Sequence, residues 1–115
     1  MPIRVLVVDD EPIVREALRL FLGQEPGLEV VGEAGDGQGA LELAARLGPD
    51  VVLLDLKLPR LSGVQALRRL REAAPGARAL AFTGFADALT ARAALDAGAA
   101  GVVPKGAQVR EVADA

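Results

Sequence analysis

Five polar residues in this sequence have the types and the placement for phosphoryl chemistry at a bound cation. Asp9 and Asp10 follow one apolar run, and Asp55 follows another. Thr83 and Lys105 follow two further apolar runs. A carboxylate beside a divalent cation can attack a phosphoryl group, while a hydroxyl and an ammonium bind the phosphoryl oxygens. We therefore predict that these five side chains share one site.

The cation in such a site must be held by oxygen, because the chain contains no His and no Cys. Crowded carboxylates repel one another unless a cation neutralises them, and Mg²⁺ is the hard cation that fits oxygen ligands. It keeps several waters, so one or two carboxylates and a carbonyl suffice. We expect Asp10 and Asp55 to bind it directly and Asp9 to act through water. The backbone carbonyl of Lys57 would complete the protein ligands.

Taken singly, each of these residues has a simpler explanation. An Asp after a strand often forms a turn, and Asp10 could cap a helix that begins at Pro12. Thr83 alone could be a turn hydroxyl, and Lys105 alone a solvated charge. Their joint occurrence after several different strands favours the common site.

Apolar runs and amphipathic stretches alternate along the chain, which is typical of a parallel sheet with helices on both faces. Right-handed crossovers would join the strands. The predicted strands are 3–8, 28–31, 51–54, 77–82 and 100–103, and the predicted helical segments are 12–22, 37–47, 63–74, 86–97 and 107–115.

Strand composition also predicts the order of the sheet. The runs 3–8 and 51–54 are the most apolar and belong in the centre. The run 28–31 carries Glu29 and ends at Gly32, and the last run meets Pro104, so both are edge strands. The predicted order is 2-1-3-4-5, in which ligands bind at the carboxyl ends of the central strands.

The first two predicted helices have recognisable faces and ends. Asp36 is expected to cap helix 37–47, and Gly48 to follow its end. In helix 12–22, three charged residues are expected to point outward: Arg15, Glu16 and Arg19. Six apolar residues of this helix are expected to form its inner face: Ile13, Val14, Ala17, Leu18, Phe21 and Leu22.

Length and composition narrow the possible classes of protein. A chain of 115 residues with 51% hydrophobic and 25% charged residues is one globular domain. A net charge of -3 and the lack of Tyr and Trp argue against nucleic-acid binding by this segment. The apolar run 5–8 is far too short to span a membrane, and it lacks the charged start and the cleavage site of a signal peptide. The absence of Cys fits a cytoplasmic protein.

With these residues in this order, the sequence resembles the receiver domains of two-component response regulators. The resemblance covers nearly the whole chain. It is carried by Val7-Val8-Asp9-Asp10-Glu11, Asp55-Leu56-Lys57-Leu58-Pro59 with Ser62-Gly63, Thr83-Gly84, Gly98-Ala99-Ala100-Gly101 and Lys105.

The resemblance implies a flavodoxin-like fold and specific roles for the site residues. Asp55 would be the phospho-acceptor, and Asp9 and Asp10 would organise Mg²⁺. Thr83 would be the switch hydroxyl, and Lys105 would pair with the phosphoryl group. The phosphodonor would be a phosphohistidine on a sensor histidine kinase, and phosphorylation would change the surface around the fourth helix and fifth strand.

The resemblance also bears on what lies outside this segment. Residues 1–115 would form one receiver domain whose last helix is truncated, so we expect the natural chain to continue. Lys105-Gly106 is similar to the branch with a C-terminal helix-turn-helix, so DNA would be bound only through that missing domain. A homodimer is expected on phosphorylation. Val102 stands where the family usually has an aromatic relay residue.

Three alternatives remain open on the sequence alone. Val102 favours a receiver-like interaction module that works without phosphate. An Mg²⁺-dependent phosphohydrolase would have a second acid two residues after its nucleophile, where this chain has Lys57. Flavin binding is disfavoured, because the turn after the first strand offers acids instead of phosphate-binding donors.

Overall fold

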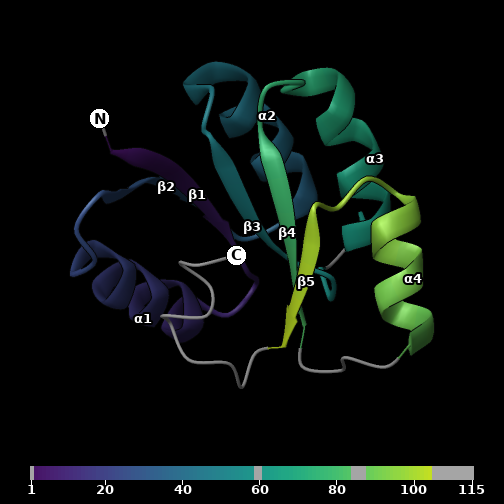
Figure 1. Ribbon diagram of the computed structural model, residues 1–115, viewed down its shortest axis with the longest axis horizontal. Helices are drawn as coiled ribbons and strands as arrows, with labels where there is room; N and C mark the ends of the chain where they lie inside the picture. The colour runs from purple at the N-terminus through teal and green to yellow at the C-terminus, as the bar shows by residue number, and fades with distance from the viewer. Residues whose placement is uncertain (1, 59–60, 84–87, 105–115) are drawn as a thin grey trace.

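The computed structural model describes residues 2–58, 61–83 and 88–104, and within them the chain forms one parallel α/β sheet covered by helices (Figure 1). The sheet has five strands in the order β2-β1-β3-β4-β5, which confirms the predicted order. The strands are β1 (Ile3–Val8), β2 (Leu28–Ala34), β3 (Val51–Asp55), β4 (Arg78–Thr83) and β5 (Gly101–Pro104), and the helices are α1 (Pro12–Gly23), α2 (Gly37–Leu47), α3 (Gly63–Ala73) and α4 (Ala88–Asp96).

Helices cover both faces of the sheet, as predicted (Figure 1). One face packs against α2, α3 and α4 through a core in which Leu6, Val52 and Leu54 are fully buried. The other face packs against α1, where Leu18 and Leu22 meet Val7 and Leu53. Alternate residues of β1 and β3 thus serve the two cores, which explains why these strands are apolar throughout. Both cores hold the strand ends in fixed positions.

The β2 strand is longer than the sequence predicted. It was expected to end before Gly32, but it continues to Ala34 past a register shift opposite Val5 and Leu6. A side chain at Gly32 would lie 3.0 Å from Leu47 Cδ1 and 3.3 Å from Leu6 Cδ1. The glycine therefore allows close packing within the strand and does not end it. The extension brings Ala34 beside the end of β1.

The orientation of α1 corrects two predictions about its faces. Ile13 is 80% exposed and Phe21 is 53% exposed, although both were expected to face the core. A helix on a flat sheet buries one stripe, and here Leu18 and Leu22 form its buried part. The outward placement of Arg15 is also wrong, because its side chain is only 21% exposed.

Helix ends agree closely with the sequence. The Asp36 carboxylate accepts a hydrogen bond from Gly39 N at 2.7 Å, and Gly48 ends α2 in the left-handed conformation. Ser62 and Gln65 form a capping box at α3. The other boundaries lie within two residues of the predicted ones where they are described. The predicted helical residues 86–87 and 107–115 lie outside the described residues.

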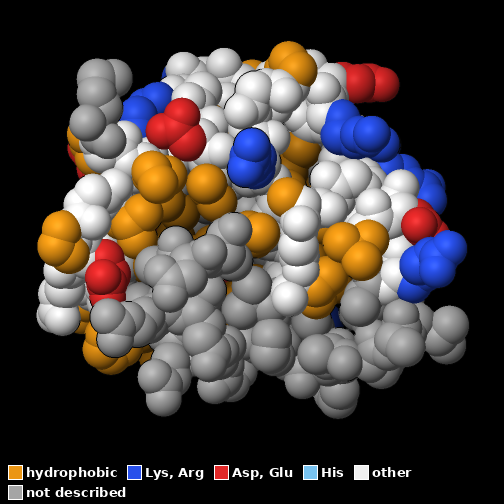
Figure 2. Space-filling model, in the orientation of Figure 1, with side chains coloured by type: hydrophobic (Ala, Val, Ile, Leu, Met, Phe, Trp, Pro, Cys, Tyr) orange, Lys and Arg blue, Asp and Glu red, His pale blue; other side chains and the backbone are white. Residues whose placement is uncertain are grey.

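The charge on the helix surfaces differs from that at the strand ends. Basic side chains gather over α3 and α4 on the right of Figure 2, and Arg68, Arg69 and Arg71 of α3 are exposed. The outer surface of α3 is thus basic, in contrast to the acidic residues at the strand ends. None of the described helices has the length and apolar character needed to cross a membrane.

Candidate functional site

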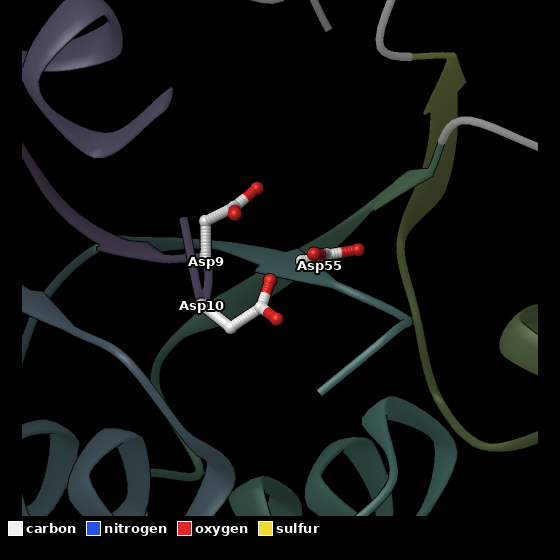
Figure 3. Close-up of side chains that lie close together, drawn as sticks. All are labelled: Asp9, Asp10 and Asp55. Carbon is white, nitrogen blue, oxygen red and sulfur yellow. The ribbon is translucent and has the colours of Figure 1, made fainter. Parts of the chain in front are cut away.

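The carboxyl ends of β1 and β3 bring three aspartates together (Figure 3). One carboxylate oxygen each of Asp9, Asp10 and Asp55 lies within 4.8 Å of the others. Asp9 is 0% exposed and Asp55 is 1% exposed, whereas Asp10 is exposed. The predicted meeting of the three acids is therefore confirmed. Strand register explains it, because Val8 of β1 pairs with Leu54 of β3.

Hydrogen bonds on each side of Asp9 fix the turn between β1 and α1. Asp9 N donates to Ala34 O at 3.1 Å, which continues the β1–β2 ladder. Asp9 Oδ1 accepts from Glu11 N at 2.9 Å. Glu11 is the N-cap of α1 and makes no side-chain cap bond, so the suggestion that Asp10 caps this helix is wrong. Asp10 is left pointing toward Asp55 (Figure 3).

Asp55 is held by the loop that follows it. Its Oδ1 accepts a hydrogen bond from Lys57 N at 3.0 Å. Leu56 N donates to Phe82 O at 3.2 Å, and Gly63 N donates to Leu56 O at 3.3 Å. The start of α3 thus closes directly onto the residue after Asp55. The structure gives the Lys57 peptide a role in orienting the Asp55 carboxylate, and the predicted role of its carbonyl stays a prediction.

The fourth and fifth site residues are only partly placed. Thr83 ends β4, one residue after Phe82, which pairs with Asp55. The backbone of Thr83 therefore lies at the same edge of the sheet as the acids, and its register partner on β5 is Pro104. Lys105 lies outside the described residues. The predicted roles of the Thr83 hydroxyl and the Lys105 amine stay predictions.

The acid cluster fits a hard divalent cation. It consists of three carboxylates from two strand ends, two of them buried, with their oxygens within 4.8 Å of one another. Burying neighbouring negative charges is costly unless a positive charge compensates them. Oxygen ligands alone favour Mg²⁺ or a similar ion. The residues present are therefore suited to hold Mg²⁺.

Sequence reasoning missed one residue that contacts this site. Arg15 Nη1 donates to the carbonyl oxygen of Asp9 at 2.6 Å. Arg15 lies in the first turn of α1, where a positive charge opposes the helix dipole. This unfavourable placement was the available signal that Arg15 needs a local partner.

Val102, the position that lacks an aromatic residue, is partly buried on β5. It packs against the core shared by α2, α3 and α4. Its neighbour across the ladder is Ala81 of β4. The side chains that meet at this point of the β4–β5 ladder are therefore small and aliphatic.

Comparison with known proteins gives a consistent result. The family model for the response regulator receiver domain matches residues 5–115. The response regulator GacA of Pseudomonas viridiflava is 42% identical over 113 residues, which are 98% of this chain and 53% of the relative. The chain thus spans about half the length of the curated relatives it matches first.

Two solved structures show the same similarity. A two-component response regulator of the LuxR family from Aurantimonas sp. SI85-9A1 has a TM-score of 0.93 and 39% identity, covering 100% of this chain and 82% of that one. A response regulator from Burkholderia pseudomallei, solved with a phosphorylated aspartic acid, calcium ion and citrate, has a TM-score of 0.89 and 31% identity, covering 97% and 65%. By fold, acid site and sequence, the chain belongs to the family of response regulator receiver domains of two-component systems.

Proposed function

We propose that Asp55 accepts a phosphoryl group in an Mg²⁺-dependent reaction and that this modification switches the domain. The observation that carries the proposal is the nearly complete burial of Asp55, 1% exposed, in a cluster with Asp9 and Asp10. The B. pseudomallei relative, which contains a phosphorylated aspartic acid, supports the same chemistry. Asp55 lies at the end of a central strand, where ligands of this fold bind.

The reaction would be a transfer between two partners. A carboxylate oxygen of Asp55 attacks phosphorus, a P–O bond forms, and the P–N bond of a phosphohistidine breaks as its imidazole takes up a proton. The hydrogen bond from Lys57 N to Asp55 Oδ1 fixes the carboxylate plane for this attack. Bound Mg²⁺, held by Asp10, Asp55 and the Lys57 carbonyl with Asp9 acting through water, would supply positive charge to the phosphoryl oxygens. Thr83 and Lys105 would bind the product.

Membership of the response regulator receiver family supports a protein as phosphodonor. Ile13 lies in the first turn of α1, four residues after Asp9, and its side chain is 80% exposed, so a bound protein could cover it. We infer a sensor histidine kinase as the donor, which would act in the cytoplasm. The domain would catalyse only its own phosphorylation and dephosphorylation.

The expected output is a change around α4 and β5. We propose that residues 1–115 are one receiver domain and that phosphorylation promotes a homodimer. Relatives about twice as long as this chain support a further domain, for which we propose a helix-turn-helix that contacts DNA. The described side chains of α4 that lie at positions 92–96 include only one buried residue, Ala94. Shifting this helix would break few large contacts.

Intact-mass measurement tests the acceptor assignment. The chain is incubated with acetyl phosphate with and without Mg²⁺, and the gain of one phosphoryl group is expected only with Mg²⁺. Asp55→Asn should abolish the gain, because an amide cannot form the acyl phosphate. Asp50→Asn is the matched control, since Asp50 precedes β3, at the opposite end of that strand from Asp55, and its substitution should leave the gain unchanged. Phosphorylation of the Asp55→Asn protein to the wild-type level would refute the proposal.

Val102 is aliphatic where the family usually has an aromatic relay residue, and this favours a second candidate, a receiver-like module that works without phosphate. Dimerisation of the Asp55→Asn protein, measured by sedimentation, separates the two. If phosphate is the switch, only the phosphorylated wild-type chain dimerises. If Asp55→Asn dimerises as well as that chain, the second candidate is favoured.

A further inference from the structure

Arg15 binds the peptide unit that joins two of the acids. Its Nη1 donates to the Asp9 carbonyl oxygen at 2.6 Å, and that oxygen belongs to the peptide bond between Asp9 and Asp10. The orientation of this peptide unit sets the direction of the Asp10 Cα–Cβ bond, from which the exposed carboxylate projects. The guanidinium therefore holds the backbone from which a predicted cation ligand projects.

Neighbouring residues hold Arg15 in place. Arg15 Nε lies 3.6 Å from Glu33 Oε1, and Arg19 Nε lies 3.3 Å from Glu33 Oε2. A Cβ added to Gly35 would lie 3.1 Å from Arg15 Nη1, so a side chain at this position would push the guanidinium from its place. Glu33 lies in the β2 extension, and Gly35 directly follows the end of that strand. Glu33 and Gly35, at and just after the end of β2, thus hold the Arg15 side chain in place.

We propose that Arg15, seated on Glu33 and Gly35, is a positioning residue for cation binding at the acid site. This inference rests on the proposed function. Arg15 does not touch the carboxylates in the hydrogen bonds described; it acts through the Asp9 carbonyl. Partners that orient metal ligands from behind typically contribute tenfold or more to metal affinity.

Whether Mg²⁺ binding weakens or strengthens when Arg15 is replaced separates a positioning role from a simple effect of its charge. Removing a cationic side chain near a cation site reduces repulsion, which by itself strengthens Mg²⁺ binding. Loss of the Asp9 contact loosens the Asp10 ligand, which weakens Mg²⁺ binding. The two effects of Arg15→Gln are therefore opposite in direction, and positioning predicts the weaker binding.

The test is an Mg²⁺ titration of the ¹⁵N-labelled chain, followed by the amide shifts of the β1–α1 turn. Arg15→Gln should raise the Mg²⁺ dissociation constant roughly tenfold. Arg19→Gln is the matched control, because Arg19 shares Glu33 with Arg15 and loses the same charge without contacting Asp9. Its dissociation constant should equal that of the wild type. Acetyl phosphate rates at saturating Mg²⁺ should be nearly equal in the wild type and Arg19→Gln.

Two further variants keep the test decisive if Arg15→Gln does not fold. Gly35→Ala retains every charge and displaces only the flexible guanidinium, so it should weaken Mg²⁺ binding by a smaller factor. Arg15→Lys, which keeps a cationic donor, should recover part of the affinity lost in Arg15→Gln. Equal or tighter Mg²⁺ binding by both Arg15→Gln and Gly35→Ala would overturn the inference. A wild-type chain that binds no Mg²⁺ would instead contradict the proposed function.

Discussion

Aspartates lie beside one another where the strands have their carboxyl ends (the carboxyl edge of the sheet), whereas at the opposite, amino edge Asp50 is hydrogen-bonded to the backbone amide of Arg4. At the carboxyl edge Asp9 and Asp55 are both buried within a cluster of acids. At the amino edge Asp50 Oδ2 accepts from Arg4 N at 2.9 Å. Arg4 Nη1 in turn donates to Leu47 O at 2.8 Å and to Gly48 O at 3.0 Å, at the end of α2.

The difference separates the part of the sheet that stabilises the fold from the part that does chemistry. At the amino edge a carboxylate accepts from a backbone amide and a guanidinium donates to helix-end carbonyls, so the polar groups there contribute to stability. Like charges are gathered at the carboxyl edge, so stability is lost there until a cation binds. Neutralising one of the clustered acids should therefore raise stability, whereas removing a polar partner at the amino edge should lower it and leave Mg²⁺ binding unchanged.

The largest expected effect is that of Gly63→Ala, at the carboxyl edge. A Cβ there would lie 2.4 Å from Leu56 Cα and 2.9 Å from Asp55 O, and neither backbone atom can move without displacing the acid site. We expect a loss of about 3 kcal/mol in the free energy of unfolding, measured by urea denaturation. Gly76→Ala, where no atom lies within 4 Å of the added Cβ, is the control. Equal losses in both variants would contradict this reading of the carboxyl edge.

Asp9→Asn should stabilise the fold, whereas most substitutions of buried residues destabilise it. Without Mg²⁺, removing one buried negative charge should raise the free energy of unfolding by roughly 1–3 kcal/mol. The amide oxygen can still accept the hydrogen bond from Glu11 N. Thermal melting with and without Mg²⁺ measures the effect, and Mg²⁺ should stabilise the variant less than the wild type. The free energy of unfolding of Asp50→Asn should not rise. A rise as large as that of Asp9→Asn would contradict the difference between the two edges of the sheet.

Arg4→Met tests the amino edge. It keeps an unbranched side chain but loses two hydrogen bonds to carbonyl groups at the end of α2. We expect a loss of about 1–2 kcal/mol in the free energy of unfolding and an unchanged Mg²⁺ dissociation constant. A clear change in Mg²⁺ binding would mean that the two edges are coupled.

The smallest expected effect is that of Asp36→Ala, an acid that follows β2 at the carboxyl edge. Its carboxylate caps α2 through Gly39 N, and it is absent from the acid cluster. Loss of the cap should lower the free energy of unfolding by about 1 kcal/mol. The Mg²⁺ affinity should stay the same, because the proposed cation ligands are the acids at the ends of β1 and β3 and do not include Asp36.

The predictable features of this molecule are the local ones. Apolar runs that end in Asp9 and Asp55 lie within single strands, so they indicated both the central strands and the acid site. The roles of Arg15 and Gly32 depend on how α1 rotates and how β2 pairs, which are set by packing between distant segments. Helical spacing alone predicts an apolar face without its exact rotation, so Ile13 and Phe21 were placed wrongly in the core.

The most direct test of the central claim is an Mg²⁺ titration of the wild-type chain that compares amide shifts at the two edges. If the three aspartates hold one cation, the amides of Asp10 and Lys57 shift together with a single dissociation constant, while those of Arg4 and Asp50 do not move. Asp55→Asn should suppress those shifts. The account would be contradicted if Mg²⁺ moved no amide in the β1–α1 and β3–α3 loops, or moved those of the amino edge instead.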